Sequence, residues 1–442
     1  MKKKNEKNVK KYLALILMMF AMSTIYTLPY LRYSFFTALQ DAMGLSNDAT
    51  KYGNLMSVYG IMNLLMYLPG GIIADKFDSK KLLVFSMVGT GALGLWMATW
   101  PSYNGLLIIH LLFGITTVLT FWSSSVKVVN LLASSGEQGE TFGFLESGRN
   151  VIGLALSAIT LALFAYLSKK VNEVAGITFV IVLYSIIMIL VGIVLYFMLP
   201  NFAKDPETTN ASVKDSLIAM GKCFKMPITW CLSAFIFTCS IMTGSGSYYA
   251  PYLQEFCGMT VAAASTYAVV RTTVAPILAG PVAGKASKKF GRSTPVIMFG
   301  CIGLIITNIL LRLVPGKTNV LFLIMVIMVL TAFSYSCNRS VYWATIDEVG
   351  APKNVVGSIT GIASMIGFLP DAFLGTLYGS WIDNFGMEIA YNKIFTFCVI
   401  VSVLGLFVAL CGDRIIKKAQ KTQKTIEKNN NSETILIFNL KE

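Results

Sequence analysis

Twelve long apolar runs constrain this chain more than any other feature of its sequence. A helix needs about 20 apolar residues to cross the hydrocarbon core of a bilayer, and runs of that length recur along the whole chain. We therefore expect an all-α polytopic membrane protein. The predicted membrane-spanning helices are 12–38, 52–74, 81–100, 104–128, 141–167, 175–199, 228–254, 260–284, 294–313, 319–346, 354–381 and 389–411.

Composition supports a membrane solvent. Only 13% of the 442 residues are charged, whereas soluble chains average about a quarter. The net charge of +14 does not indicate nucleic-acid binding, because the basic residues sit in short clusters between apolar runs. The first run is too long for a signal peptide and lacks a small-residue cleavage site, so we expect it to be retained. The eight cysteines show neither disulfide nor zinc spacing, and we expect no metal and no cofactor.

The basic clusters also predict the orientation. An even number of spans puts both termini on one side, and both terminal segments are rich in lysine. The loop 285–292 and the lysines near position 80 fall on the same side. Cytoplasmic loops carry the excess of Lys and Arg, so we predict a multi-pass plasma-membrane protein with both termini in the cytoplasm.

Two internal matches indicate a duplicated six-helix unit. The basic turn that begins at Gly71 has a counterpart at Gly284, an offset of 213, and the segment ending at Gly143 matches one ending at Gly357, an offset of 214. Two parallel halves with the substrate site between them are a known transporter plan. The predicted organisation is 1–200 for the N-terminal half, 201–227 for a cytoplasmic loop, 228–412 for the C-terminal half and 413–442 for a polar cytoplasmic tail.

The stretch LPGGIIADKFDSKKLL joins the second and third predicted spans. Its pattern G-x-x-x-D-K-x-x-x-K resembles the signature loop of the major facilitator superfamily, although Asp78 and Ser79 depart from that motif. The resemblance extends over nearly the whole chain and implies two pseudo-symmetric six-helix halves that work by alternating access. It also implies a gating role for the matching residues. Arg149, which shares a helix face with Glu146 three residues before it, is a predicted gating residue as well. These predicted gating residues are Gly71, Asp75, Lys76, Lys80, Gly284, Lys289, Gly291, Arg292 and Arg149.

Several charged residues lie inside the spans and cannot be topology signals. Ionisable groups in hydrocarbon are costly and usually face a bundle interior or a wet cavity. Their surplus is positive, and Arg offers a fork to carboxylate or phosphate. We therefore predict a cavity for an organic anion, with aromatic groups that hold its body. The alternative for each cation is a structural role. It would be neutralised by an acidic side chain or a helix C-terminus, or its charged end would extend to the membrane surface. The predicted substrate-binding residues are Arg32, Arg271, Arg339, Lys127, Tyr30, Trp122, Tyr249 and Trp343.

Two acidic residues are the predicted proton carriers, Glu146 and Asp371. The tyrosine-rich first span with Arg32 resembles the sugar-phosphate and organic-anion permease branch of the superfamily. The seventh span departs from that branch because it contains no Arg; its Gly244 and Gly246 indicate a helix that can bend. The spans also lack the proline signature of multidrug antiporters.

The predicted function is secondary transport of a small organic anion, coupled to protons or to exchange. Alternatives are drug or metabolite efflux, lysolipid transport through a lateral opening, or a transporter-like membrane sensor. The chain shows no nucleotide-binding loop, nucleophile triad or metal cluster, so we expect no enzyme. The expected partners are a small-molecule substrate, a proton where transport is proton-coupled, and the lipid bilayer, with a monomer as the functional unit.

Overall fold

The computed structural model describes residues 2–132, 138–199, 221, 223–351 and 353–439, and this part of the chain is helical with no strand. The helices before residue 200 pack mainly on one another, and so do those after it. We refer to them as the N-terminal and C-terminal helices. The predicted loop 201–227 lies mostly outside the described residues, so the division there stays a prediction.

The N-terminal helices account for the first six predicted spans. The first span is interrupted between α1 and α2, near Pro29, and the fourth contains a π-helical segment, η1. The bounds are α1 Lys2–Thr24, α2 Arg32–Ala42, α3 Ala49–Lys76, α4 Ser79–Met97, α5 Tyr103–Gly114, η1 Ile115–Trp122, α6 Ser123–Leu132, α7 Gln138–Lys170 and α8 Glu173–Met198.

The C-terminal helices account for the other six. The seventh span is interrupted between α10 and α11, and α17 contains two spans separated by a kink at Gly386, whose φ is 73°. The bounds are α10 Pro227–Gly246, α11 Tyr249–Cys257, α12 Val261–Phe290, α13 Thr294–Leu313, η3 Thr318–Val320, α14 Leu321–Val341, η4 Tyr342–Ala344, α15 Thr345–Glu348, α16 Lys353–Gly367 and α17 Pro370–Asn439.

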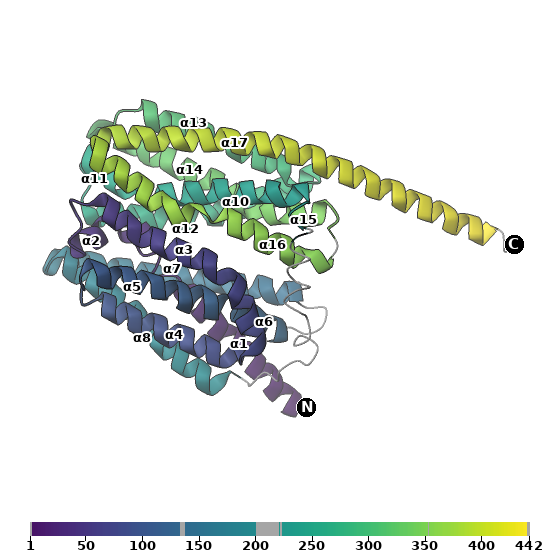
Figure 1. Ribbon diagram of the computed structural model, residues 1–442, viewed down its shortest axis with the longest axis horizontal. Coiled ribbons are helices and arrows are strands. Elements are labelled where there is room, and N and C mark those ends of the chain that lie inside the picture. The colour runs from purple at the N-terminus through teal and green to yellow at the C-terminus, as the bar shows by residue number, and fades with distance from the viewer. Residues whose placement is uncertain (1, 133–137, 200–220, 222, 352, 440–442) are drawn as a thin grey trace.

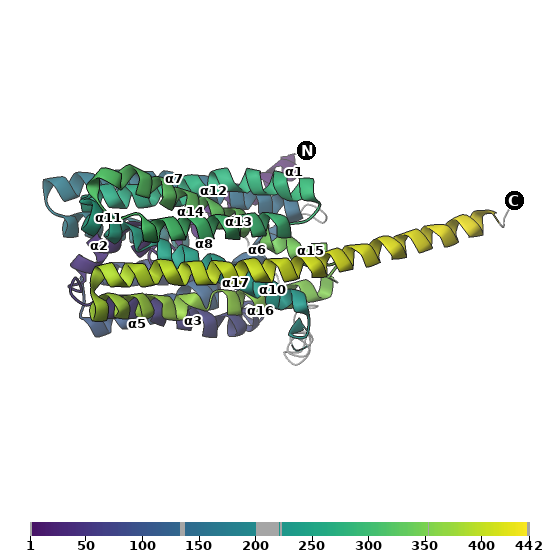
Figure 2. The same cartoon turned by 90° about the horizontal axis from the view of Figure 1, so that it is seen from above.

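Eight helical segments of the described chain are long and apolar enough to cross a membrane. One of them, Ile359–Thr422, covers two predicted spans, so the eight segments account for nine of the twelve. The predicted spans 12–38, 52–74 and 81–100 are also helical, but the first is broken after Thr24. Both ends of the chain leave the bundle at the same end, and α17 continues well beyond it (Figures 1 and 2). We call this the terminal end, and the other the distal end.

The most extensive helix contact in the molecule joins the two sets of helices, between α3 and the first part of α17. Glycines permit this close approach. A Cβ on Gly53 would lie 2.0 Å from the carbonyl oxygen of Gly375, and one on Gly379 would lie 2.3 Å from that of Ala49. Since Cβ atoms cannot occupy such positions, only glycine allows the two backbones to touch. This contact, the α3–α17 seam, closes the distal half of the bundle.

Candidate functional site

Two interrupted helices meet where the two sets of helices face each other. The first span breaks between Thr24 and Arg32, and the seventh between Gly246 and Tyr249. Interrupted spans at corresponding positions of two repeats are the strongest general pointer to a transporter's binding site. The Arg32 side chain donates a hydrogen bond from Nη2 to the Tyr248 hydroxyl at 3.2 Å, so the two breaks are in direct contact.

Arg32 is buried, with 6% of its surface exposed. Its guanidinium carbon lies 4.6 Å from the ring centroid of Tyr52, 4.9 Å from Phe36 and 5.5 Å from Tyr248. Cation–π contacts of this kind stabilise a desolvated cation. No carboxylate among the described residues forms an ion pair with Arg32, and its Nε and Nη1 have no hydrogen-bond acceptor there. The aromatic faces therefore replace the usual acidic partner.

Arg271 is buried in the same manner on the C-terminal side. Its Nη2 donates to the carbonyl of Gly246 at 2.9 Å, and its guanidinium lies 4.9 Å from the Tyr249 ring. Gly246 is the last residue of α10, so the cation lies at a helix C-terminus, where positive charge is favoured. The break that Gly244 and Gly246 predicted is present, and Arg271 holds its carbonyl end.

Tyr30 and Asp371 form a second link between the two sets of helices. The Tyr30 hydroxyl donates to Oδ2 of Asp371 at 3.0 Å, and the Tyr30 ring contacts Tyr33 and Tyr59. Asp371 is the second residue of α17. A Cβ on Gly60 of α3 would lie 2.3 Å from the backbone of Asp371, so the two helices are in close contact here. This predicted proton carrier is thus in direct contact with a predicted substrate-binding tyrosine.

Arg339 also acts electrostatically on Asp371. It lies near the end of α14 with its side chain exposed. Arg339 and Arg32 are the two cations that act electrostatically on Asp371. The predicted aromatic residues Trp122 and Trp343 are also partly exposed, at 38% and 37%, on opposite sets of helices. The Asp371 carboxylate is therefore subject to the charges of a buried cation and an exposed one.

Lys127 has a structural partner. Its Nζ donates to the carbonyl of Ala74 at 2.9 Å, two residues before the end of α3. Lysine at the C-terminal turn of a helix satisfies a carbonyl that has no intrahelical donor. Neutralisation at a helix C-terminus was the alternative to substrate binding in the sequence analysis, and this geometry agrees with that alternative.

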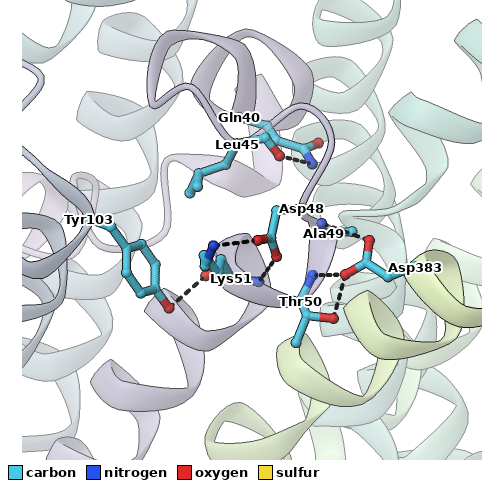
Figure 3. Close-up of polar contacts among 8 residues, drawn as sticks. All are labelled: Gln40, Leu45, Asp48, Ala49, Thr50, Lys51, Tyr103 and Asp383. Carbon is cyan, nitrogen blue, oxygen red and sulfur yellow. Dashed lines mark hydrogen bonds and ion pairs between the residues drawn. The ribbon is translucent and has the colours of Figure 1, made fainter.

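The distal end is closed by a carboxylate that the sequence did not single out (Figure 3). Asp383, on α17, accepts hydrogen bonds from the backbone amides of Ala49 and Thr50 at 3.0 and 2.7 Å, and from the Thr50 hydroxyl at 2.5 Å. It thereby caps the N-terminus of α3 from the other set of helices. Asp48 caps the same helix from within, through the amide of Lys51 at 2.8 Å.

Further hydroxyl contacts follow the α3–α17 seam inward. The Thr376 hydroxyl donates to Oδ1 of Asn54 at 2.6 Å and lies within hydrogen-bond distance of the Ser57 hydroxyl, at 2.8 Å. Beside these residues a groove of about 600 Å³ opens between α3, α5 and α17, with Ile61, Leu107 and Phe373 among its walls. Neither the hydroxyl contacts nor Asp383 carried a periodic or motif signal in the sequence.

The motif residues lie at the terminal end. Lys80 lies 5.5 Å from the ring centroid of Tyr196. Gly291 ends α12 with φ of 69°, and Arg292 pairs with Asp413 at 2.5 Å. Gly284 and Lys289 lie in the last turns of α12 with Lys289 exposed.

Some of these predictions remain untested. The side chains of Asp75, Lys76 and Glu146 and the surroundings of Gly71 lie outside the described residues, so their predicted gating and proton-carrying roles stay predictions. The same holds for a pair between Glu146 and Arg149; the structure shows Arg149 acting electrostatically on Tyr26. Within the described residues no group of His, Cys, Asp and Glu could hold a metal ion.

Comparison with known proteins gives consistent matches over most of the chain. The family model described as Major Facilitator Superfamily matches residues 12–375. The inner membrane protein YqcE of Escherichia coli K12 is 32% identical over 393 residues, which cover 87% of this chain and 90% of YqcE. The inner membrane protein YihN of the same organism is 27% identical and covers 94% of this chain and 97% of its own.

Solved structures show the same fold at low identity. A bacterial homolog of the human lysosomal transporter Spinster, in an inward-facing conformation, has a TM-score of 0.69 at 16% identity and covers 93% of this chain and 98% of its own. The nucleoside transporter NupG has a TM-score of 0.65 at 16% identity and covers 93% and 99%. These structures confirm the predicted fold class. The family match and the inner-membrane relatives confirm a multi-pass membrane protein that is a transporter rather than an enzyme.

Proposed function

Because the chain belongs to the major facilitator superfamily, we propose that it is a secondary transporter that moves a small organic anion together with a proton by alternating access. The observation that carries this proposal is the hydrogen bond between Tyr30 and Asp371 across the two sets of helices, with the exposed cation of Arg339 acting on the same carboxylate.

The coupling follows from charge. With Asp371 ionised, Arg339 is attracted to a carboxylate of the protein itself. A proton on Asp371 removes that attraction, and a carboxylate or phosphate of the substrate takes its place beside the guanidinium. Anion binding is then favoured only when Asp371 is protonated, so the anion and the proton are transported together. The transported pair is less charged than the anion alone.

The same proton alters the contact between the two sets of helices. Ionised Asp371 can only accept from Tyr30, whereas the protonated acid carries a donor of its own. The link at this point therefore changes when the proton binds. Tyr30, Tyr33 and Tyr59 supply an aromatic wall beside it. Trp122 and Trp343 are partly exposed and are the further aromatic residues proposed to contact an organic body.

The conformation supports access from the terminal end. The α3–α17 seam and Asp383 close the distal end, while α3 and α16 contact each other only slightly. If both termini are cytoplasmic, as the basic clusters predict, this is the inward-facing state. Uptake and export both pass through such a state, so the direction depends on the gradients.

Reconstituted protein in liposomes tests the proposal. We expect a proton gradient to drive accumulation of a labelled anion chosen from sugar phosphates and carboxylates by thermal stabilisation of the purified protein. Asp371→Asn should lose gradient-driven accumulation but keep exchange of labelled for unlabelled substrate, and Arg339→Gln should lose both. Retained gradient-driven accumulation in Asp371→Asn would contradict the coupling role. Stabilisation by cations or neutral compounds alone would contradict the anion class.

A second substrate class rests on a different observation. Transport of an amphipathic lipid needs a lateral opening to the bilayer. The groove between α3, α5 and α17, with Asn54 and Ser57 beside its apolar walls, is the candidate for such an opening. Val58→Trp would fill this groove. Loss of lysolipid flux with retained flux of soluble anions would assign the groove to lipid substrates.

A further inference from the structure

A small, partly open cavity lies directly beside Arg32. Its volume is about 20 Å³, and its lining includes Arg32, His110, Met43, Met56 and Met97. A space of this size holds one water or one monatomic ion and excludes any organic substrate. The cavity therefore needs an explanation separate from the transported anion.

The guanidinium of Arg32 beside the cavity makes few of the hydrogen bonds that it could donate. Arg32 is 94% buried, and within the described residues its single hydrogen bond goes to the neutral hydroxyl of Tyr248. The Nε and Nη1 atoms are buried without an acceptor. Asp371 acts on Arg32 at longer range, but the hydrogen bond of that carboxylate goes to Tyr30. A buried charge is costly unless a counter-charge lies beside it.

The walls favour an anion over water. A water molecule needs two to four polar partners, including acceptors for its own hydrogens. The Tyr52 hydroxyl already donates to the carbonyl of Phe36, and Nδ1 of His110 is engaged with the carbonyl of Leu106 at 2.8 Å. A water here can donate to the remaining ring nitrogen of His110 or to the Tyr52 oxygen, which still accepts, but it leaves the charge of Arg32 uncompensated. A halide needs no acceptor and supplies the counter-charge, and polarizable Met side chains suit a large, weakly hydrated ion.

We propose that this cavity is a binding site for a single halide ion, chloride in the cell, held by Arg32. The ion would neutralise the guanidinium at the contact between the two interrupted helices. Because Arg32 reaches Tyr248 across the two sets of helices, halide binding would favour the conformation in which the distal end is closed. This proposal does not depend on the identity or charge of the transported substrate.

Thermal unfolding of the detergent-purified full chain tests it directly. We compare sodium chloride and bromide with sodium sulfate at matched ionic strength, since sulfate is too large for the cavity. We expect the midpoint to rise with the logarithm of halide concentration, on the order of 3 °C at 100 times the dissociation constant, and not with sulfate. Arg32→Gln should remove the halide response. Arg271→Gln, which changes a buried Arg that does not line the cavity, should retain it.

A measurement on the unaltered protein guards against a poorly folded variant. Crystals soaked in bromide should show an anomalous-scattering peak beside the Arg32 guanidinium. An ordered water at that place without a bromide peak, or equal stabilisation by halide and sulfate, would overturn the proposal. A halide response that persists in Arg32→Gln would overturn it as well. Failure here leaves the flux assays of Asp371 unaffected, so the two proposals are separable.

Discussion

Replacement of Asp383 by alanine should open the distal end of the bundle. The carboxylate of Asp383 is the acceptor for two backbone amides and one hydroxyl of the first turn of α3, which belongs to the other set of helices (Figure 3). Opening the distal end must separate α3 from α17, so these bonds exist only while that end is closed. Their loss therefore weakens one conformation and not the other.

The magnitude follows from the geometry. A hydrogen bond to a charged group contributes about 1.5–3 kcal/mol when it is protected from water. The two bonds to Thr50 are exposed and the one to Ala49 is partly buried. Hydrogen bonds to water therefore offset much of the free energy that these three bonds contribute. We take about 2 kcal/mol for the three together. Since about 1.4 kcal/mol is tenfold in population, the ratio of open to closed distal ends should rise roughly 30-fold.

Spin-label distance measurements across the distal end can detect this change. Labels at Ser46→Cys and Asn384→Cys would report the separation between the two sets of helices. Seven of the eight native cysteines are buried, so replacement of half-buried Cys411 suffices to limit background labelling. In Asp383→Ala the long-distance fraction should grow at the expense of the short one.

Asp48→Ala provides the matched control. Asp48 caps the same helix N-terminus, but its partner Lys51 belongs to the same set of helices. That variant should lower thermal stability without shifting the distance distribution. An unchanged distribution in Asp383→Ala, or an equal shift in both variants, would refute the reasoning that Asp383 holds the distal end closed.

Other substitutions test neighbouring contacts. Gly53→Ala places a methyl group against the backbone of α17 and should shift the same distance distribution toward the open form. Tyr30→Phe removes the hydrogen bond to Asp371 and should change the pH dependence of transport in liposomes more than its maximal rate. The pKa of Asp48 lies below its ordinary value because the side chain and backbone of Lys51 donate hydrogen bonds to it. Its contribution to stability is therefore present above the ordinary aspartate pKa of about 4 and is lost as pH falls through the lower folded value. The thermal midpoints of the wild type and of Asp48→Asn should therefore converge at a pH below the folded pKa of Asp48.

The fold could be predicted because the bilayer allows few solutions. Apolar run length fixes the spans, and basic loops fix which ends of the spans lie together. The structure keeps both termini at one end of the bundle (Figure 1). Gly244 and Gly246 also indicated a weak point in the seventh span, and α10 ends at Gly246. These features depend on local sequence alone.

The site was only partly predictable, for a physical reason. The sequence identified ionisable groups that are costly in hydrocarbon, and Arg32, Arg271 and Asp371 are indeed buried or bonded inside the bundle. It could not say what each of them meets. Arg32 and Tyr248 are 216 residues apart, and Lys127 meets a backbone carbonyl that carries no sequence signal. Partners of this kind depend on tertiary packing.

Asp383 was missed because a carboxylate near a span end reads as an ordinary loop residue. Its importance arises from where α17 places it, at the N-terminus of a helix 333 residues away in sequence. A helix N-terminus favours any nearby anion through its free amides and its dipole. The sequence shows the acid and the helix start separately, but it does not show that they meet.

The chemistry of the α3–α17 seam bears on how such a protein can move. At the distal end the two helices meet through glycine backbones and through hydrogen bonds of Asp383 and Thr376. Burial of large apolar side chains would resist opening in proportion to the area exposed. Hydrogen bonds, in contrast, exchange for bonds to water at a small net cost, and glycines expose little apolar surface. A gate built from these groups closes firmly when dry and opens readily when water enters, as a transporter that must expose its site to both sides requires.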